Sequence, residues 1–130
     1  MRYLLDSNIC IGIIKGDLAL VRELRSLRPS LIVVPSVVRA ELYYGVQKSR
    51  HAASNRRVLE AFLEPFTTLP FDDAAALQYG MIRSLLEQLG TPIGPNDLMI
   101  AAIGMANDLT VVTRNTREFG RVVGLRVDQW

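Results

Sequence analysis

The stretch Met1-Arg-Tyr-Leu-Leu-Asp-Ser-Asn8 opens the chain and indicates its fold. Its apolar run, Tyr3 to Leu5, is typical of a strand buried in a parallel sheet. The run ends in the carboxylate of Asp6, and Ser7 follows as a good helix N-cap before the apolar segment Ile9 to Ile14. An acid at the carboxyl end of a strand, where a helix begins, lies where open α/β sheets carry their chemistry.

Composition favours one globular domain spanning residues 1–130. Hydrophobic residues make up 49% of the chain and charged residues 22%, which argues against disorder. The single cysteine, Cys10, cannot form an internal disulfide, and we interpret it as a buried small apolar residue. The single histidine, His51, argues against histidine-based zinc sites and catalytic triads.

Hydropathy limits where in the cell the protein is expected, and charge indicates which partners it is expected to bind. No apolar run reaches the length of a membrane span, and Asp6 interrupts the N-terminal run, so we expect a cytoplasmic protein without membrane contact. The formal net charge is +2, and only Lys15 and Lys48 of the 15 cationic residues are lysines. Arginine suits bidentate contact with phosphate, which favours nucleic acid as a partner.

Apolar strands alternate with helical patterns along the chain, which predicts a three-layer α/β/α fold around a mainly parallel sheet of four or five strands. The expected strands are residues 3–5, 31–34, 67–70, 109–113 and 125–127. The expected helices are 9–15, 17–28, 36–47, 55–66, 72–89 and 96–107. Asp17 and Asp72 are interpreted as N-caps.

The helical patterns also predict which faces are buried. The helix from Asp72 is expected to end at Gly90 and to point Ala74, Leu77, Met81, Leu85 and Leu89 inward. The helix from Asn55 is expected to bury Val58, Leu59, Phe62, Leu63 and Phe66. The helix 96–107 is apolar nearly all round, so we expect it to be the most buried one.

Two further acids are candidates for chemistry beside Asp6. Glu41 falls within the apolar stripe of helix 36–47, where a capping role is excluded and an unpaired charge is costly. Asp97 lies in the first turn of the apolar helix 96–107, close to the same sheet edge if that helix leads into the strand 109–113. Simpler roles stay open: a cap for Asp6, a helix-dipole acid for Asp97, and for Glu41 an ion pair with Arg39 or Arg114 or a misjudged helix phase.

Three carboxylates at one edge would repel each other, and a hard divalent cation such as Mg²⁺ or Mn²⁺ would relieve that repulsion. Such an ion could activate water and stabilise charge on a phosphate. Thr113, Asn115 or Glu118, at the end of the expected fourth strand, could complete its shell. No glycine-rich phosphate loop is present, which disfavours the usual kinds of nucleotide binding.

Four ordered segments carry a family resemblance: Leu4-Leu-Asp6-Ser-Asn8, Val37-Val-Arg-Ala-Glu41-Leu-Tyr-Tyr-Gly45, Ile93-Gly-Pro-Asn-Asp97-Leu-Met-Ile-Ala-Ala102 and Val111-Val-Thr113-Arg-Asn-Thr-Arg-Glu-Phe119. Together they resemble the PIN-domain family and, more narrowly, its VapC-type ribonuclease toxins. The resemblance covers nearly the whole chain. It assigns the three family acids to Asp6, Glu41 and Asp97. Many family members carry a fourth aspartate where this chain has Asn115, or where Glu118 supplies the acid from further on.

The resemblance implies a Mg²⁺-dependent endoribonuclease toxin, acting on structured RNA and especially tRNA. It implies a homodimer and a small VapB-like antitoxin, for which the second to fourth helices form the natural docking arm. Ser7, Asn8 and Thr113 would support the site, with Ser7 capping the helix and leaving Asp6 free for metal. Backbone contacts to RNA fall to Arg114, Arg117 and Arg121, with the edge Arg50–Arg57 as a second candidate.

Two other readings of the site stay open. One is a metal-dependent phosphatase or phospho-acceptor domain in which Asp6 is itself the nucleophile. That chemistry would call for a second aspartate two residues on, where Asn8 stands. The other is a non-catalytic binding module on the same fold, against which the three acids argue.

Overall fold

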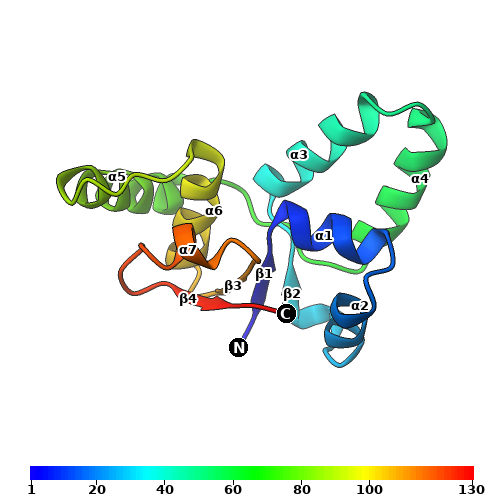
Figure 1. Ribbon diagram of the computed structural model, residues 1–130, viewed down its shortest axis with the longest axis horizontal. Coiled ribbons are helices and arrows are strands. Elements are labelled where there is room, and N and C mark those ends of the chain that lie inside the picture. Colours follow the sequence, from blue (N-terminus) through cyan, green and yellow to red (C-terminus); the bar gives the residue numbers. More distant parts are fainter.

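The computed structural model describes residues 1–130 and contains a four-stranded sheet whose neighbouring strands are all parallel (Figure 1). The strands lie in the order β2-β1-β3-β4, which places β1 and β3 in the interior of the sheet. Their bounds are β1 (Tyr3–Leu5), β2 (Ile32–Val33), β3 (Thr110–Val112) and β4 (Arg126–Asp128). The prediction of a parallel α/β fold is confirmed.

Helices surround the sheet as a three-layer α/β/α fold requires. Their bounds are α1 (Ser7–Ile14), α2 (Leu18–Arg25), α3 (Ser36–Gln47), α4 (Ala52–Leu63), α5 (Asp73–Gln88), α6 (Pro95–Ala106) and α7 (Thr116–Phe119), with a 3₁₀ turn, η1 (Pro29–Leu31), before β2. In Figure 1 the hairpin of α3 and α4 lies at one end of the molecule and α5 at the other, with β1 between them. No helix has the combination of length and apolar character that crossing a membrane would need.

The register of the sheet explains why Asp6 and Thr113 come together. Leu5 of β1 pairs with Val112 of β3, and both side chains are fully buried. The next residue of each strand therefore leaves the sheet at the same edge, and the Asp6 N–H donates to the Val112 carbonyl at 3.2 Å. The predicted convergence of two chain segments at the carboxyl edge is thus built by pairing between β1 and β3.

Helix α6 is the most buried helix, as its uniform apolar character predicts. Residues 100–104 are all buried, and the helix packs against α5 and β3. Gly104 allows close packing here, because an added Cβ would lie 3.1 Å from the Val111 side chain and 3.3 Å from the Leu125 side chain. This packing fixes the helix start, and therefore Asp97 in its first turn, relative to the sheet.

The predicted inner face of α5 is wrong. Leu77, Met81 and Leu89 are 65%, 59% and 60% exposed, whereas the buried face consists of Ala75, Ile82 and Leu86. The helix carries two apolar stripes, and the one with the larger side chains faces solvent. An exposed apolar stripe of this length is typical of a surface that contacts another protein.

Three smaller differences concern boundaries and faces. The segment 67–70 is not a strand: it runs beside β2 but forms only one bridge, between Val33 and Thr67. Helix α4 begins at Ala52 rather than Asn55, and Val58, expected inside, is 54% exposed. Asp17 and Asp72 do cap α2 and α5, as predicted, because their carboxylates accept from backbone N–H groups of the first turn.

Candidate active site

Asp6 itself, and not Ser7, is the N-cap of α1. Its backbone is extended, with φ −78° and ψ 174°, and its Oδ1 accepts from the Ile9 N–H at 3.0 Å. Ser7 is already the first helical residue, and its buried Oγ has no hydrogen-bond partner. The prediction that Ser7 would cap the helix and leave Asp6 free is therefore wrong. Both residue types cap well, and the backbone conformation decides between them.

Thr113 holds the second oxygen of Asp6. Its hydroxyl donates to Asp6 Oδ2 at 2.5 Å and accepts from the Asn115 N–H at 2.9 Å. Thr113 is fully buried and Asp6 is 6% exposed, so this contact is shielded from water. Thr113 therefore positions the carboxylate, and its hydroxyl is fully engaged in doing so.

Burial dominates the electrostatics of Asp6. Desolvation raises the pKa of its carboxyl above the ordinary value, because the charged form loses water. The hydrogen bonds from Thr113 and from the N–H groups of Ile9 and Asn8 act in the opposite direction. No cation forms an ion pair with Asp6.

Asp97, Asn115 and Glu118 form a second cluster beside Asp6. The Asn115 side-chain amide donates to Asp97 Oδ2 at 3.0 Å and to Glu118 Oε2 at 3.1 Å. Burial, the hydrogen bond with Glu118 and the charges of Glu118 and Asp6 raise the pKa of Asp97 to about 6. Asn115 therefore links two carboxylates that repel each other, and Glu118 brings a further acid to the site.

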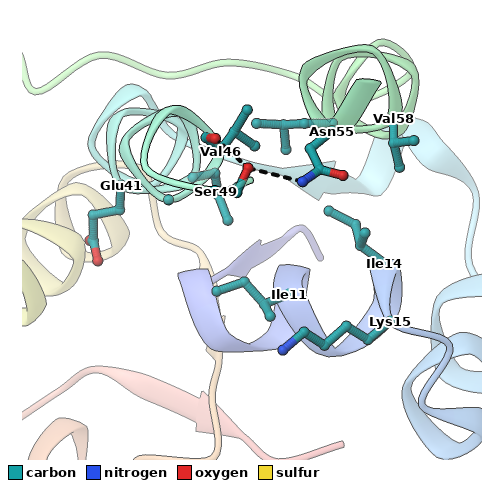
Figure 2. A pocket seen from close by; sticks show the side chains of 11 residues that line it. Ile11, Ile14, Lys15, Glu41, Val46, Ser49, Asn55 and Val58 are labelled. Carbon is teal, nitrogen blue, oxygen red and sulfur yellow. Dashed lines mark hydrogen bonds between the residues drawn. The ribbon is translucent and has the colours of Figure 1, made fainter. Parts of the chain in front are cut away.

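Glu41 is placed differently from the other two family acids. It lies on α3, next to the apolar cleft that this helix forms with α1 and α4, and its side chain extends from the side of α3 that faces α6 (Figure 2). Its Oε1 is buried and has no hydrogen-bond partner. An unpaired buried carboxylate oxygen is costly, so Glu41 has the environment of a group that awaits a ligand.

Neither suggested ion-pair partner reaches Glu41. Arg39 donates to the carbonyl oxygens of Val34 and Phe66 at 2.7 and 3.2 Å, so it joins the end of β2 to the segment after α4. Arg114 pairs with Asp17 at 2.8 Å. A structural ion pair therefore does not account for the buried acid on α3.

The remaining predicted residues differ in their freedom to bind RNA. Arg114 is held by Asp17, and Arg121 donates to the Pro92 carbonyl at 2.9 Å. Arg117 is exposed and makes no ion pair or side-chain hydrogen bond, so it is the free cation of the three. Asn8 is exposed, and only its backbone N–H contacts Asp6.

The donor set suits a hard divalent cation. Asp6, Asp97, Glu118 and Glu41 offer oxygen atoms only, and no ion pair neutralises any of them. No three acidic, histidine or cysteine side chains are grouped closely enough to hold an ion in this arrangement. The oxygen donors fit a magnesium-type ion in chemical type, but their spacing in this arrangement does not by itself form a metal cage.

The apolar cleft is the feature that the sequence did not predict. It has a volume of about 450 Å³ and is lined mainly by apolar side chains, among them Ile11, Ile14, Leu42, Val46 and Leu59 (Figure 2). The expected docking arm comprised the second to fourth helices, whereas the cleft lies between α1, α3 and α4. Ile11 and Ile14 were the available signal, because the helix that follows β1 is apolar on more than one side.

Comparison with known proteins places this geometry in a family. The sequence matches the PIN domain family over residues 3–125. It is 43% identical over 130 residues to the tRNA(fMet)-specific endonuclease VapC of Shigella flexneri, covering 100% of this chain and 98% of that protein. The fold matches VapBC2 of Rickettsia felis bound to a promoter DNA fragment, with a TM-score of 0.94, 38% identity and coverage of 100% and 99%. It also matches DNA-bound VapBC of Salmonella typhimurium, with a TM-score of 0.94, 39% identity and coverage of 100% and 98%.

The chain therefore belongs to the PIN-domain family of proteins. Within that family it stands among the VapC ribonucleases, as the resemblance of its four segments predicted.

Proposed function

We propose that the chain is the Mg²⁺-dependent endoribonuclease toxin of a toxin–antitoxin pair. The observation that carries the proposal is the set of uncompensated carboxylates at the carboxyl edge of the sheet: Asp6, Asp97 and Glu118 together, with Glu41 on the neighbouring helix. Relatives of similar length and 39–43% identity are named as tRNA endonucleases, which supports RNA as the substrate.

Each residue of the site has a defined task in this proposal. Thr113 fixes the Asp6 carboxylate, and Asn115 holds Asp97 and Glu118 in place. Asp6, Asp97 and Glu41 would hold the ion, with Glu118 as the candidate fourth acid. When bound, Mg²⁺ or Mn²⁺ supplies a water of lowered pKa and stabilises charge on the phosphate. Arg117, which no acid neutralises, would contact the RNA backbone near the site.

We further propose tRNA as the substrate class, in the cytoplasm where tRNA is found. The Shigella flexneri relative is named as specific for tRNA(fMet), so initiator tRNA is the first substrate to test. The matched comparison is an elongator tRNA at the same concentration. Faster cleavage of initiator tRNA supports the substrate assignment, and equal rates contradict it.

The experiment that tests the enzymatic proposal uses protein purified free of antitoxin and of host nucleases. Cleavage of tRNA is followed with Mg²⁺ and with EDTA, for the wild type and for Asp6→Asn and Asp97→Asn. Asp73→Asn is the matched control, because it removes an acid from the first turn of α5, outside the cluster. Cleavage that persists in EDTA, or in both site variants, contradicts the proposal.

The phospho-acceptor alternative is disfavoured by the contacts of Asp6. Both of its oxygens accept hydrogen bonds inside the protein, one from Ile9 and one from Thr113, and it is almost fully buried. A nucleophilic aspartate needs an oxygen that can reach the phosphorus atom of the substrate. These contacts suit a carboxylate that is fixed in place as a metal ligand better than one that attacks a phosphorus atom.

The partner we propose is a VapB-like antitoxin that occupies the apolar cleft between α1, α3 and α4. Two of the similar solved structures are VapBC assemblies, and an apolar cleft beside Glu41 offers both anchorage and access to the acids. Val46→Asp should weaken copurification with a coexpressed antitoxin, and Val123→Asp, an exposed position after α7, should not. Equal copurification of both variants with the antitoxin would contradict this placement.

We propose that the exposed apolar stripe of α5 contacts a second copy of the chain in a homodimer. Leu77, Met81 and Leu85 recur every four residues and form one exposed apolar stripe along the helix. A two-fold axis across this stripe would pack it against the same stripe of the other copy, which is the self-complementarity of an isologous dimer. Met81→Lys should shift the protein from dimer to monomer in light scattering, and a persistent dimer would contradict this assignment.

A further inference from the structure

The exposed face of α3 beyond Glu41 carries an aromatic–cation pair that the proposed site does not use. The Lys48 Nζ lies 4.9 Å from the centroid of the Tyr44 ring. Tyr44 is 67% exposed and belongs to none of the aromatic pairs of the protein. A large aromatic side chain left in water beside a cation has little structural purpose, so its binding capacity is the feature to explain.

The pair lies on the same face of α3 as Glu41. Glu41, Tyr44 and Lys48 are spaced i, i+3 and i+7, so they share one face of α3. The cleft residues Leu42 and Val46 lie on another face of the same helix. The pair is therefore separate from the proposed antitoxin cleft and about one helical turn from Glu41.

The residues around the Tyr44–Lys48 pair are mainly cationic, which favours binding of a polyanion. No acidic residue occurs between Leu42 and Leu59, whereas Lys48, Arg50, Arg56 and Arg57 lie in this interval. Only Arg56 is neutralised, by Glu60 at 3.0 Å. This interval includes the turn of the α3–α4 hairpin, which projects at one end of the molecule in Figure 1.

We infer that Tyr44 and Lys48 form a stacking platform for an unpaired base of the RNA, with Lys48 contacting the adjacent phosphate. Aromatic side chains bind single-stranded nucleic acid by stacking on bases, and a nearby cation binds the backbone. Bases inside a duplex are unavailable for such stacking, so the ligand class is RNA with an unpaired loop or single strand. The inference rests on the proposed ribonuclease function and adds how the substrate is held.

The test measures binding separately from cleavage. Fluorescence anisotropy in EDTA follows a labelled RNA hairpin with an unpaired loop, and a fully paired duplex of the same composition. The proteins are wild type, Tyr44→Ala, Tyr44→Trp and Lys48→Gln. Tyr43→Ala is the matched control, because this neighbouring tyrosine is exposed on a different face of α3. Melting temperatures verify that all variants fold.

The expected result is about tenfold weaker hairpin binding for Tyr44→Ala, restored by Tyr44→Trp and absent in Tyr43→Ala. Duplex binding should change little for Tyr44→Ala, and Lys48→Gln should reduce the salt dependence of binding by about one charge. In cleavage assays Tyr44→Ala should raise KM more than it lowers kcat. The stacking of an RNA base, and not general charge, would then account for the effect.

Two results would overturn the inference. One is hairpin binding by Tyr44→Ala within twofold of the wild type. The other is loss of antitoxin binding or of the dimer in Tyr44→Ala with RNA affinity intact, which would make this face a protein contact. If the wild type binds hairpin RNA through Tyr44 but cleaves none with Mg²⁺, the proposed function fails and the platform stands. If it cleaves normally without Tyr44, the platform fails and the function stands.

Discussion

The end of β1 and the neighbouring face of α3 each present a carboxylate, but the two carboxylates are satisfied to different degrees. Asp6 has a partner for each oxygen, supplied by Ile9 and Thr113. Glu41 has one buried oxygen without any partner. The sheet edge is therefore organised by contacts within the protein, whereas the α3 side has a buried carboxylate oxygen that no group of the chain satisfies. Substitutions on the two sides should therefore have opposite effects on the stability of the metal-free protein.

The largest expected effect is on cleavage by Glu41→Gln. This change keeps the size of the side chain and removes its charge, so Mg²⁺ loses one anionic ligand. We expect at least the roughly 100-fold loss of activity that marks the upper range for groups supporting metal ligands. Single-turnover cleavage of tRNA measures it. Glu64→Gln, at an exposed acid just after α4, is the control, and wild-type rates in Glu41→Gln would remove Glu41 from the site.

The second largest expected effect tests the sheet edge, where Thr113 holds the Asp6 carboxylate. Thr113→Val removes the hydroxyl that donates to Asp6 and accepts from Asn115. We expect roughly a 10- to 100-fold loss of cleavage, because Asp6 loses its orientation while no acid is removed. Thr110→Val, at a buried threonine within β3, is the matched control. If the two variants cleave equally well, Thr113 has no positioning role.

The stability comparison predicts opposite signs for two alanine substitutions in the metal-free protein. Asp6→Ala should lower the free energy of unfolding by about 1–3 kcal/mol, because it removes a helix cap and a buried hydrogen bond. Glu41→Ala should leave it unchanged or raise it by up to about 1 kcal/mol, because an unpaired carboxylate is removed. Urea unfolding in EDTA measures both. Destabilisation by Glu41→Ala as large as that by Asp6→Ala would mean that Glu41 has a structural partner.

The smallest effect is a pH dependence that originates at Asp97. Its pKa is raised from 3.8 to about 6 in the folded protein. A group with a raised folded pKa stabilises the fold fully below its unfolded pKa, and that stabilisation is lost as pH rises through the folded pKa. In EDTA, stability should therefore fall between about pH 4 and 6, and Asp97→Asn should flatten that segment. Thermal melts across this range measure the slope, and equal slopes would contradict the assignment.

Much of the sheet edge was predictable because short, local sequence patterns determine it. Short apolar runs that end at Asp6 and Thr113 predict parallel strands with a shared carboxyl edge, and the apolar helix that begins near Asp97 is expected to be buried. The choice between Asp6 and Ser7 as N-cap was not predictable, since both residue types cap helices and only the backbone angles distinguish them. Glu118 needed the turn of α7 to bring it to Asp97.

The surfaces were harder to predict because burial against a partner resembles burial in a core. Helix α5 has two apolar stripes, and the larger side chains Leu77 and Met81 suggested the wrong one as the inner face. Val58 misled in the same way on α4, where it lines the cleft. Periodicity shows that a face is apolar, but the fold decides whether the chain itself covers that face.

The most direct measurement of the central claim, that the acids at this edge hold a divalent ion, is the melting temperature during a Mg²⁺ titration of the metal-free protein. At about 100 times the dissociation constant, binding should add roughly 2.7 kcal/mol of stability, which corresponds to a rise of several degrees. We expect that rise in the wild type and in the Asp73→Asn control, and its loss in Asp97→Asn. An equal rise in all three proteins, or none in the wild type, would contradict the account.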